Sequence, residues 1–169
     1  MTFYIKQKVF SWRSRFSVTD GNGADRYAVT GEILTFGRKL HVTDPTGRER
    51  LYIKERLWTF LSRYELWIDG ACAATIRRDF TFFRPHYTFE GTDLEIEGDF
   101  WQHDYRFLRG GVPVGKVKKA WFTWGDFYEL TVEDPALELL LLGAVIVIDS
   151  IGEQAAAAAG ASAAATSAH

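Results

Sequence analysis

The chain has 169 residues, and its 47% hydrophobic and 15% aromatic content is enough to build one globular domain with a substantial core. Twenty Lys and Arg residues are balanced by 22 Asp and Glu, and the formal charge of −2 excludes a global field that would attract nucleic acid or an anionic membrane. The single cysteine, Cys72, excludes an internal disulfide and a multi-cysteine metal site, and it fits a reducing compartment.

The first ten residues place Lys6, Gln7 and Lys8 among apolar side chains. They lack the uninterrupted apolar run and the small-residue cleavage site of a signal peptide. We therefore expect a cytoplasmic protein.

A short aromatic pattern recurs six times along the chain. Each copy joins aromatic and Ser or Thr residues to a basic or polar stretch, and an alternation of apolar and polar residues follows. The equivalent apolar positions are separated by 24, 24, 23, 18 and 23 residues, and they are Phe16, Leu40, Tyr64, Tyr87, Tyr105 and Tyr128. This spacing indicates one two-stranded unit per copy.

Each copy continues with period two, which is typical of a half-buried strand. In the first copy, for example, Phe16 and Val18 alternate with polar residues. The alternation stops at residues typical of hairpin turns, at 20–23, 44–47, 69–70, 91–93 and 109–111. A second strand follows each turn, so the six units predict twelve short antiparallel strands.

A helix is predicted to begin at Asp134 and Pro135, because Asp is a good N-cap and Pro suits the first helical position. Between residues 136 and 148 the only charged side chain is Glu138, so this helix has no polar face and must be surrounded by apolar atoms. Its apolar run of about thirteen residues is shorter than the roughly 20 that span a bilayer, and we expect no transmembrane span. Twelve strands leave a lumen that needs a filler, and the helix fits that need.

The sequence thus predicts a mainly β protein, a twelve-stranded antiparallel closed β-barrel of six hairpin units that encloses a central hydrophobic C-terminal helix. We assign residues 1–152 to this domain. Residues 153–169 are rich in Ala, with no large apolar residue and no amphipathic stripe. We expect this low-complexity tail to be disordered.

Basic side chains collect in four of the six units, on the strands that enter the aromatic motif. They are candidates for binding an anionic lipid headgroup, because phosphate oxygens accept charge-assisted hydrogen bonds from such a patch. The candidates are Lys6, Lys8, Lys54, Arg56, Arg77, Arg78, Lys116, Lys118 and Lys119. Alternatively, these side chains face solvent and serve only solubility and the protection of strand edges.

Other kinds of chemistry find less support in the sequence. Strand alternation places His103 and Asp104 on opposite faces, which argues against a metal site, and the acidic turns lack the full calcium-loop pattern. No motif of a serine hydrolase, a phosphate-binding loop or a zinc protease is present, although Cys72 beside His86 or His103 would make a thiol–base pair. We expect a non-enzymatic protein without a cofactor, a metal or a nucleic-acid partner.

Three segments, IKQKVFSW at 5–12, GDFWQHDY at 98–105 and KKAWFTWGDFYEL at 118–130, resemble the LURP-one-related family. The resemblance spans residues 2–151. That family belongs to the tubby C-terminal-like superfamily, related to the phospholipid scramblases, and the resemblance implies a twelve-stranded barrel around a central C-terminal helix. It also implies a link to lipids, because tubby-like domains bind phosphoinositides and scramblases act at membranes.

We therefore expect a LURP-one-like barrel that binds an anionic lipid headgroup, such as a phosphoinositide, or a protein partner at the membrane periphery. The alternative is a small-molecule binder or hydrolase that uses a pocket at one mouth of the barrel. An apolar cleft with paired titratable groups would favour the alternative, and an outward basic band would favour lipid binding.

Overall fold

The structure, a computed structural model, describes residues 1–7, 14–32, 35–57, 63–79, 86–100, 102–120 and 127–166. The strands are β1 (Thr2–Gln7), β2 (Ser14–Asp20), β3 (Asp25–Gly31), β4 (Lys39–Thr43), β5 (Glu49–Arg56), β6 (Arg63–Ile68), β7 (Ala71–Asp79), β8 (His86–Glu90), β9 (Leu94–Asp99), β10 (Asp104–Arg109), β11 (Val112–Ala120) and β12 (Phe127–Val132). The helices are the 3-10 helix η1 (Pro135–Leu137) and the α-helix α1 (Glu138–Thr166).

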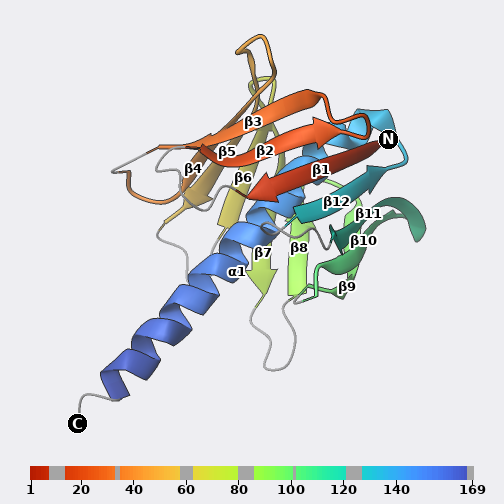
Figure 1. Cartoon of the computed structure of the whole chain (residues 1–169). Coiled ribbons are helices and arrows are strands. Elements are labelled where there is room, and N and C mark those ends of the chain that lie inside the picture. Colours follow the sequence, from red (N-terminus) through yellow and green to blue (C-terminus); the bar gives the residue numbers. More distant parts are fainter. Residues whose placement is uncertain are drawn as a thin grey trace.

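The twelve strands form one antiparallel sheet that curls around α1 (Figure 1). Their order is β8-β7-β6-β5-β4-β3-β2-β1-β12-β11-β10-β9, so the first and last strands of the chain pair with each other. The predicted mainly β fold, with twelve antiparallel strands and a C-terminal helix, is confirmed.

The barrel is nearly closed, whereas the sequence predicted full closure. The hydrogen-bonded order ends at β8 on one side and at β9 on the other, although only residues 91–93 separate these strands. The side chains on both sides of this turn keep the barrel's alternation, since Phe89 and Leu94 are both buried.

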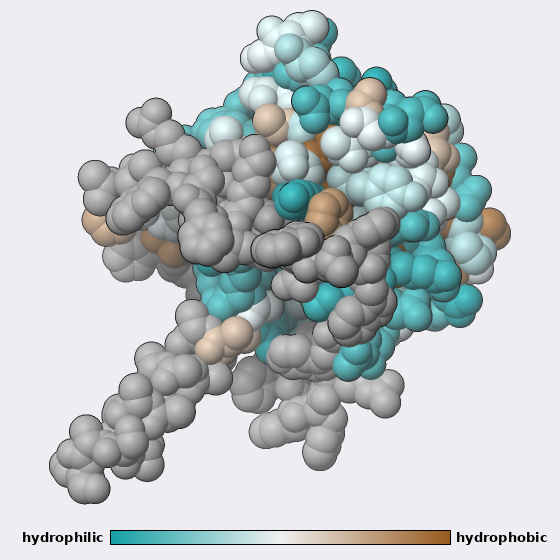
Figure 2. All heavy atoms as spheres, viewed as in Figure 1, coloured by the Kyte–Doolittle hydropathy of each residue, from teal (hydrophilic) through white to brown (hydrophobic). Residues whose placement is uncertain are grey.

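The inner face of the barrel is apolar because period-two alternation puts every second residue there. All six positions that the sequence aligned as equivalent are buried, and they are Phe16, Leu40, Tyr64, Tyr87, Tyr105 and Tyr128. The outer face carries the polar residues, and Figure 2 shows hydrophilic residues over most of the described surface in that view.

The two ends of the barrel differ. At one end, here called the turn end, lie Met1 and the short turns 21–24, 44–48, 69–70, 91–93 and 110–111. Asp69 and Gly70 both adopt positive φ, at 46° and 85°, as a two-residue primed hairpin turn requires. At the other end, here called the exit end, β1, β5, β7 and β11 finish and α1 leaves the barrel.

The helix runs back through the lumen from the turn end to the exit end (Figure 1). The side chain of Asp134 accepts a hydrogen bond from the Ala136 N–H at 2.9 Å, which confirms the predicted cap. Residues 137–151 are all buried, including Leu141 with no exposed surface. A Cβ atom added at Gly143 would lie 3.0 Å from the Leu51 side chain, so this glycine lets the helix approach the wall.

The helix continues through the Ala-rich segment to Thr166, where the sequence predicted disorder. Alanine has the highest helix propensity, and extending a helix already nucleated in the barrel avoids the cost of starting one. By length and composition Pro135–Ala156 could cross a bilayer, but 78% of its most apolar window is buried in the barrel.

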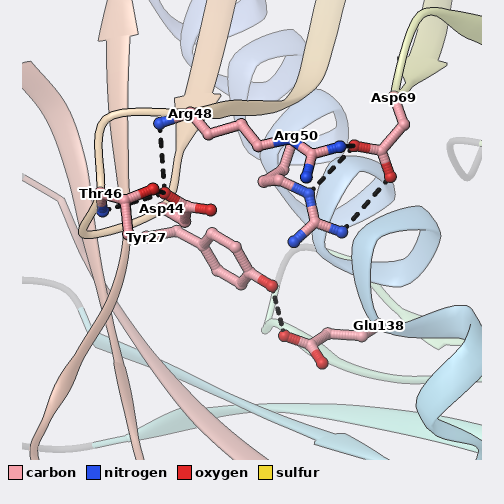
Figure 3. Close-up of polar contacts among 7 residues, drawn as sticks. All are labelled: Tyr27, Asp44, Thr46, Arg48, Arg50, Asp69 and Glu138. Carbon is pink, nitrogen blue, oxygen red and sulfur yellow. Dashed lines mark hydrogen bonds and ion pairs between the residues drawn. The ribbon is translucent and has the colours of Figure 1, made fainter.

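Polar contacts hold the helix at both ends of the lumen. Tyr27 on β3 points toward the start of α1, and its hydroxyl donates to Glu138 Oε1 at 2.6 Å (Figure 3). Near the exit end the Tyr128 hydroxyl donates to Asp149 Oδ1 at 2.7 Å. Arg38 donates to the Ser150 carbonyl at 3.1 Å. These contacts set the axial position of a helix whose side chains from Leu139 to Ile148 are all apolar.

Replacement of Leu141 by Asp should unfold the barrel. The variant buries an unpaired carboxylate in the lumen, and this costs several kcal/mol out of a total stability of roughly 5–15 kcal/mol. Thermal denaturation followed by circular dichroism would measure the loss. Val112→Asp, at a position that is 63% exposed, is the matched control and should melt like the wild type. A Leu141→Asp protein with the wild-type melting temperature would show that the helix is not needed in the lumen.

Burial and the hydrogen bond to Glu138 raise the pKa of Tyr27 to about 12 from its ordinary value of 10.0. The stability from this neutral phenol is fully present below pH 10 and is lost as the pH rises toward 12, because the unfolded state ionises first. Urea denaturation would measure the free energy of unfolding at pH 9 and at pH 12. The decrease between these two pH values should be smaller by roughly 1–2 kcal/mol in Tyr27→Phe than in the wild type. Equal losses in the two proteins would contradict this assignment.

Candidate functional site

The predicted basic residues that the structure describes gather toward the exit end, because each lies on a strand that runs toward it. They do not form one continuous patch. Lys54, Arg56 and Arg77 lie on the outer wall formed by β5, β6 and β7. A second outer wall, formed by β1, β12 and β11, carries Lys6, Lys116 and Lys118. Lys8 lies outside the described residues.

Two of the candidates occupy inward positions. Arg78 is opposite Tyr87, and Lys119 is opposite Tyr128, and both tyrosines are buried. In a strand, consecutive residues face opposite sides of the sheet, so Arg77 and Arg78 cannot both lie on the outer wall. Arg78 and Lys119 therefore do not share the outer walls with the other candidates.

The wall of β5 to β7 contains a row of three arginines in register. Arg56 is opposite Arg63, and Arg63 is opposite Arg77. Their side chains are 60%, 38% and 31% exposed, respectively. Sequence reasoning missed Arg63, because it stands alone in the chain and joins the row only through strand pairing.

Like charges on directly opposed positions destabilise a sheet, and carboxylates around the row offset this effect. The ion pairs are Arg56 Nε with Glu65 Oε1 at 2.6 Å, Arg77 Nε with Asp79 Oδ1 at 2.9 Å, Arg77 Nη1 with Glu90 Oε1 at 3.3 Å, and Arg63 Nη1 with Glu90 Oε2 at 3.9 Å. The contact of Arg63 is long, and a guanidinium carries five N–H donors. The row is thus held in place and still presents cationic groups to solvent.

Lys54 lies next to the row on the outer wall of β5. It also lines a groove of about 280 Å³. The groove is lined by Glu49, Arg50, Tyr52, Lys54, Trp67, Asp69 and Gly70. At its turn end Arg48 and Arg50 both point toward Asp69, at 3.4 Å and 3.0 Å (Figure 3). Here the arginines are matched by a carboxylate. Lys54 is exposed, with Lys39 opposite it on β4 and Glu65 opposite it on β6.

His41 lies on the neighbouring strand β4, between two carboxylates. Nδ1 contacts Glu49 Oε2 at 2.5 Å, and Nε2 contacts Glu32 Oε1 at 3.0 Å. The two nitrogens point to different carboxylates, so the three groups do not converge on a metal ion. No cluster of His, Cys, Asp or Glu suited to a metal is found among the residues that the structure describes.

The pKa of His41 reflects two opposed effects. Partial burial lowers the pKa, but the hydrogen bonds to Glu49 and Glu32 outweigh it, so the pKa is raised above 6.5. The imidazolium form then donates to both carboxylates. The two carboxylates therefore favour the charged form of the His41 ring.

The second wall is less strongly basic. Lys6 Nζ lies 5.1 Å from the centre of the Phe127 ring, and Lys116 Nζ lies 3.6 Å from Asp104. Glu129 is opposite Lys118 and separates it from β1. These carboxylates interrupt the lysines, so the wall of β5 to β7 is the better candidate.

The remaining chemical candidates are dispersed. Cys72 lies near the start of β7 and His86 is opposite Asp79 at its end, so about seven residues of strand, roughly 23 Å, separate thiol and imidazole. His103 lies in a turn with φ 50°, and its ring stacks on Tyr128 with the centroids 4.5 Å apart. Neither geometry supports a thiol–base pair with Cys72 and His86 or a metal site at His103.

Residues 1–149 match the LURP-one-related family over most of the chain. The chain belongs to this family. YxjI of Bacillus subtilis (strain 168) is 30% identical over 148 residues, which cover 88% of this chain and 91% of YxjI. A protein of Arabidopsis thaliana with a solved X-ray structure has a TM-score of 0.60 at 14% identity, over 88% of this chain and 91% of that chain. At this identity the likeness shows the barrel fold alone.

The imidazole of His41 should titrate above pH 6.5 in this LURP-one-related barrel, because both neighbouring carboxylates stabilise its charged form. NMR titration of the ring protons would measure the midpoint. Glu49→Gln should lower the midpoint, since it removes one carboxylate while keeping the side-chain shape. Glu97→Gln, on β9, is the control and should leave it unchanged. A midpoint that is the same in Glu49→Gln and the wild type would contradict the contact.

Proposed function

We propose that this LURP-one-related protein is a non-enzymatic barrel that binds an anionic lipid headgroup at the cytoplasmic membrane surface. The arginine row, with Lys54 beside it, carries the proposal. Arg56, Arg63 and Arg77 stand in register on three adjacent strands, so their guanidinium groups face the same way. Guanidinium groups bind phosphate oxygens through paired, charge-assisted hydrogen bonds.

The distribution of charge along the barrel supports an orientation in which the exit end faces the membrane. Acidic side chains crowd the turn end, and they are Asp20, Asp44, Asp69, Asp93, Glu133 and Asp134. The arginine row lies nearer to the exit end, and Arg38 and Lys39 lie there as well. An anionic membrane surface therefore attracts the exit end and repels the turn end.

The shape of the wall also supports headgroup binding. The groove beside Lys54 has aromatic residues, Tyr52 and Trp67, on opposed positions of β5 and β6. The indole N–H of Trp67 donates to Glu65 Oε2 at 3.2 Å, and this bond fixes the ring on the wall. Aromatic rings of this kind are favoured at the boundary between water and lipid.

The test is vesicle co-sedimentation with phosphatidylcholine alone and with phosphatidylcholine that contains a phosphatidylinositol phosphate. Lys54→Ala/Arg63→Ala should bind the anionic vesicles about 30-fold more weakly than the wild type, since each basic group near a membrane contributes about 1 kcal/mol. Both residues lie on the outer wall, away from the helix that fills the lumen, so the variant should keep the wild-type melting temperature.

The matched control is Arg48→Ala/Arg109→Ala, which removes the same charge at the turn end. It should bind anionic vesicles like the wild type. The proposal is wrong if the wild type binds neutral and anionic vesicles equally. It is also wrong if the control loses as much binding as Lys54→Ala/Arg63→Ala.

A further inference from the structure

The opening between β8 and β9, here called the seam, leaves two strand edges facing each other without a ladder. Every other strand pairs with two neighbours, whereas β8 pairs only with β7 and β9 only with β10 among the described strands. Within the part of the chain that the structure describes, the backbone N–H and C=O groups along both edges of the seam thus face no paired strand.

The seam is hollowed as well as unpaired. A groove of about 320 Å³ lies between the strands, lined by residues 86–89 of β8 and 94–97 of β9. Its inner side is apolar, where Tyr87, Phe89 and Ile96 remain 6%, 7% and 8% exposed. Phe89 packs edge-on against Phe107 with the ring centres 6.2 Å apart, so this floor belongs to the barrel core.

The outer side of the seam is acidic. On β9 every second residue is an exposed carboxylate, namely Glu95, Glu97 and Asp99. Glu97 is paired with Arg106 at 3.1 Å. Glu90 on β8 is paired with Arg77 and Arg63 of the arginine row, so Glu95 and Glu97 carry the negative charge of the seam. A chain segment in the seam would therefore meet apolar side chains on its inner face and negative charge on its outer face.

We propose that the seam binds an extended segment of a partner protein in which basic and apolar residues alternate. The segment adds a strand to the barrel through main-chain hydrogen bonds. Its apolar side chains pack toward Phe89 and Ile96, and its basic side chains pair with Glu95 and Glu97. The six residues of β9 limit the paired length to about six residues, or roughly 20 Å.

Charge also decides against a second copy of this chain as the occupant. Edge-to-edge pairing of two barrels would bring the carboxylates of β9 close to Glu90 or to another set of β9 carboxylates. Like charges on opposed strand positions are destabilising. A basic segment instead brings positive charge to the carboxylates of β9 along the seam. This proposal does not require lipid binding, because Glu95 and Glu97 on β9 make no ion pair with the arginine row among the contacts of the described residues.

The probe is a fluorescein-labelled peptide of nine residues that alternates Lys and Val, used at nanomolar concentration in 150 mM NaCl. Fluorescence anisotropy with the full chain should show saturable binding. A peptide that alternates Glu and Val should not bind. The Lys–Val peptide N-methylated at alternate residues should bind at least about tenfold more weakly, because it cannot donate main-chain hydrogen bonds on one edge.

Glu95→Lys should weaken binding of the Lys–Val peptide at least about tenfold, since the introduced ammonium repels the basic side chains. Asp25→Lys, at an exposed site on β3, makes the same change in charge and is the matched control. It should bind the peptide like the wild type. The melting temperatures of both variants would verify that the barrel is folded.

Three outcomes would overturn the proposal. Equal affinity for the N-methylated peptide would show that no strand is added. An equal loss in Asp25→Lys would reduce the binding to unspecific charge attraction. Sedimentation of the protein alone as a dimer that Glu95→Lys dissociates would assign the seam to a second copy.

Discussion

Burial of α1 against the inner faces of the strands is the interaction on which the rest of the structure depends. A barrel of twelve strands has a lumen too wide for its own side chains to fill, and a helix without a polar face is not stable in water. Each therefore requires the other. Leu141 and Val147 have no exposed surface, and burying one such side chain contributes roughly 1.5–3 kcal/mol. Gly143 and Gly115 mark the places where helix and wall come closest, because a Cβ at either would crowd a neighbouring leucine.

An apolar helix in an apolar lumen has nothing to fix its axial position except its polar ends. Tyr27 with Glu138 at one end and Tyr128 with Asp149 at the other supply that position, because a carboxylate at the edge of the core is costly without a hydrogen bond. The helix thus fills the lumen of the barrel. The features left for recognition lie on the outer wall and at the seam, where strand register arranges charged side chains in rows.

The open seam interrupts the hydrogen bonding of the barrel but not the alternation that builds the core. Phe89 and Leu94, on either side of the short turn, both face inward. Ring contacts still join the two sides of the seam, since Phe89 packs on Phe107 of β10 and Tyr87 packs on Phe100, which directly follows β9. Two exposed edges result, and the carboxylates of β9 discourage their pairing with another copy of the barrel.

Local pattern in the sequence determined the strands, the turns, the buried position in each of the six units and the capped apolar helix, because alternation and turn chemistry act over a few residues. Six aligned residues from Phe16 to Tyr128 were correctly placed in the core on that basis. Only the tertiary structure decided which basic residues meet. Arg63 enters the arginine row, Arg78 and Lys119 turn inward, and β8 and β9 stay apart. These outcomes depend on the pairing and register of strands, which are properties of pairs of segments that no single segment contains.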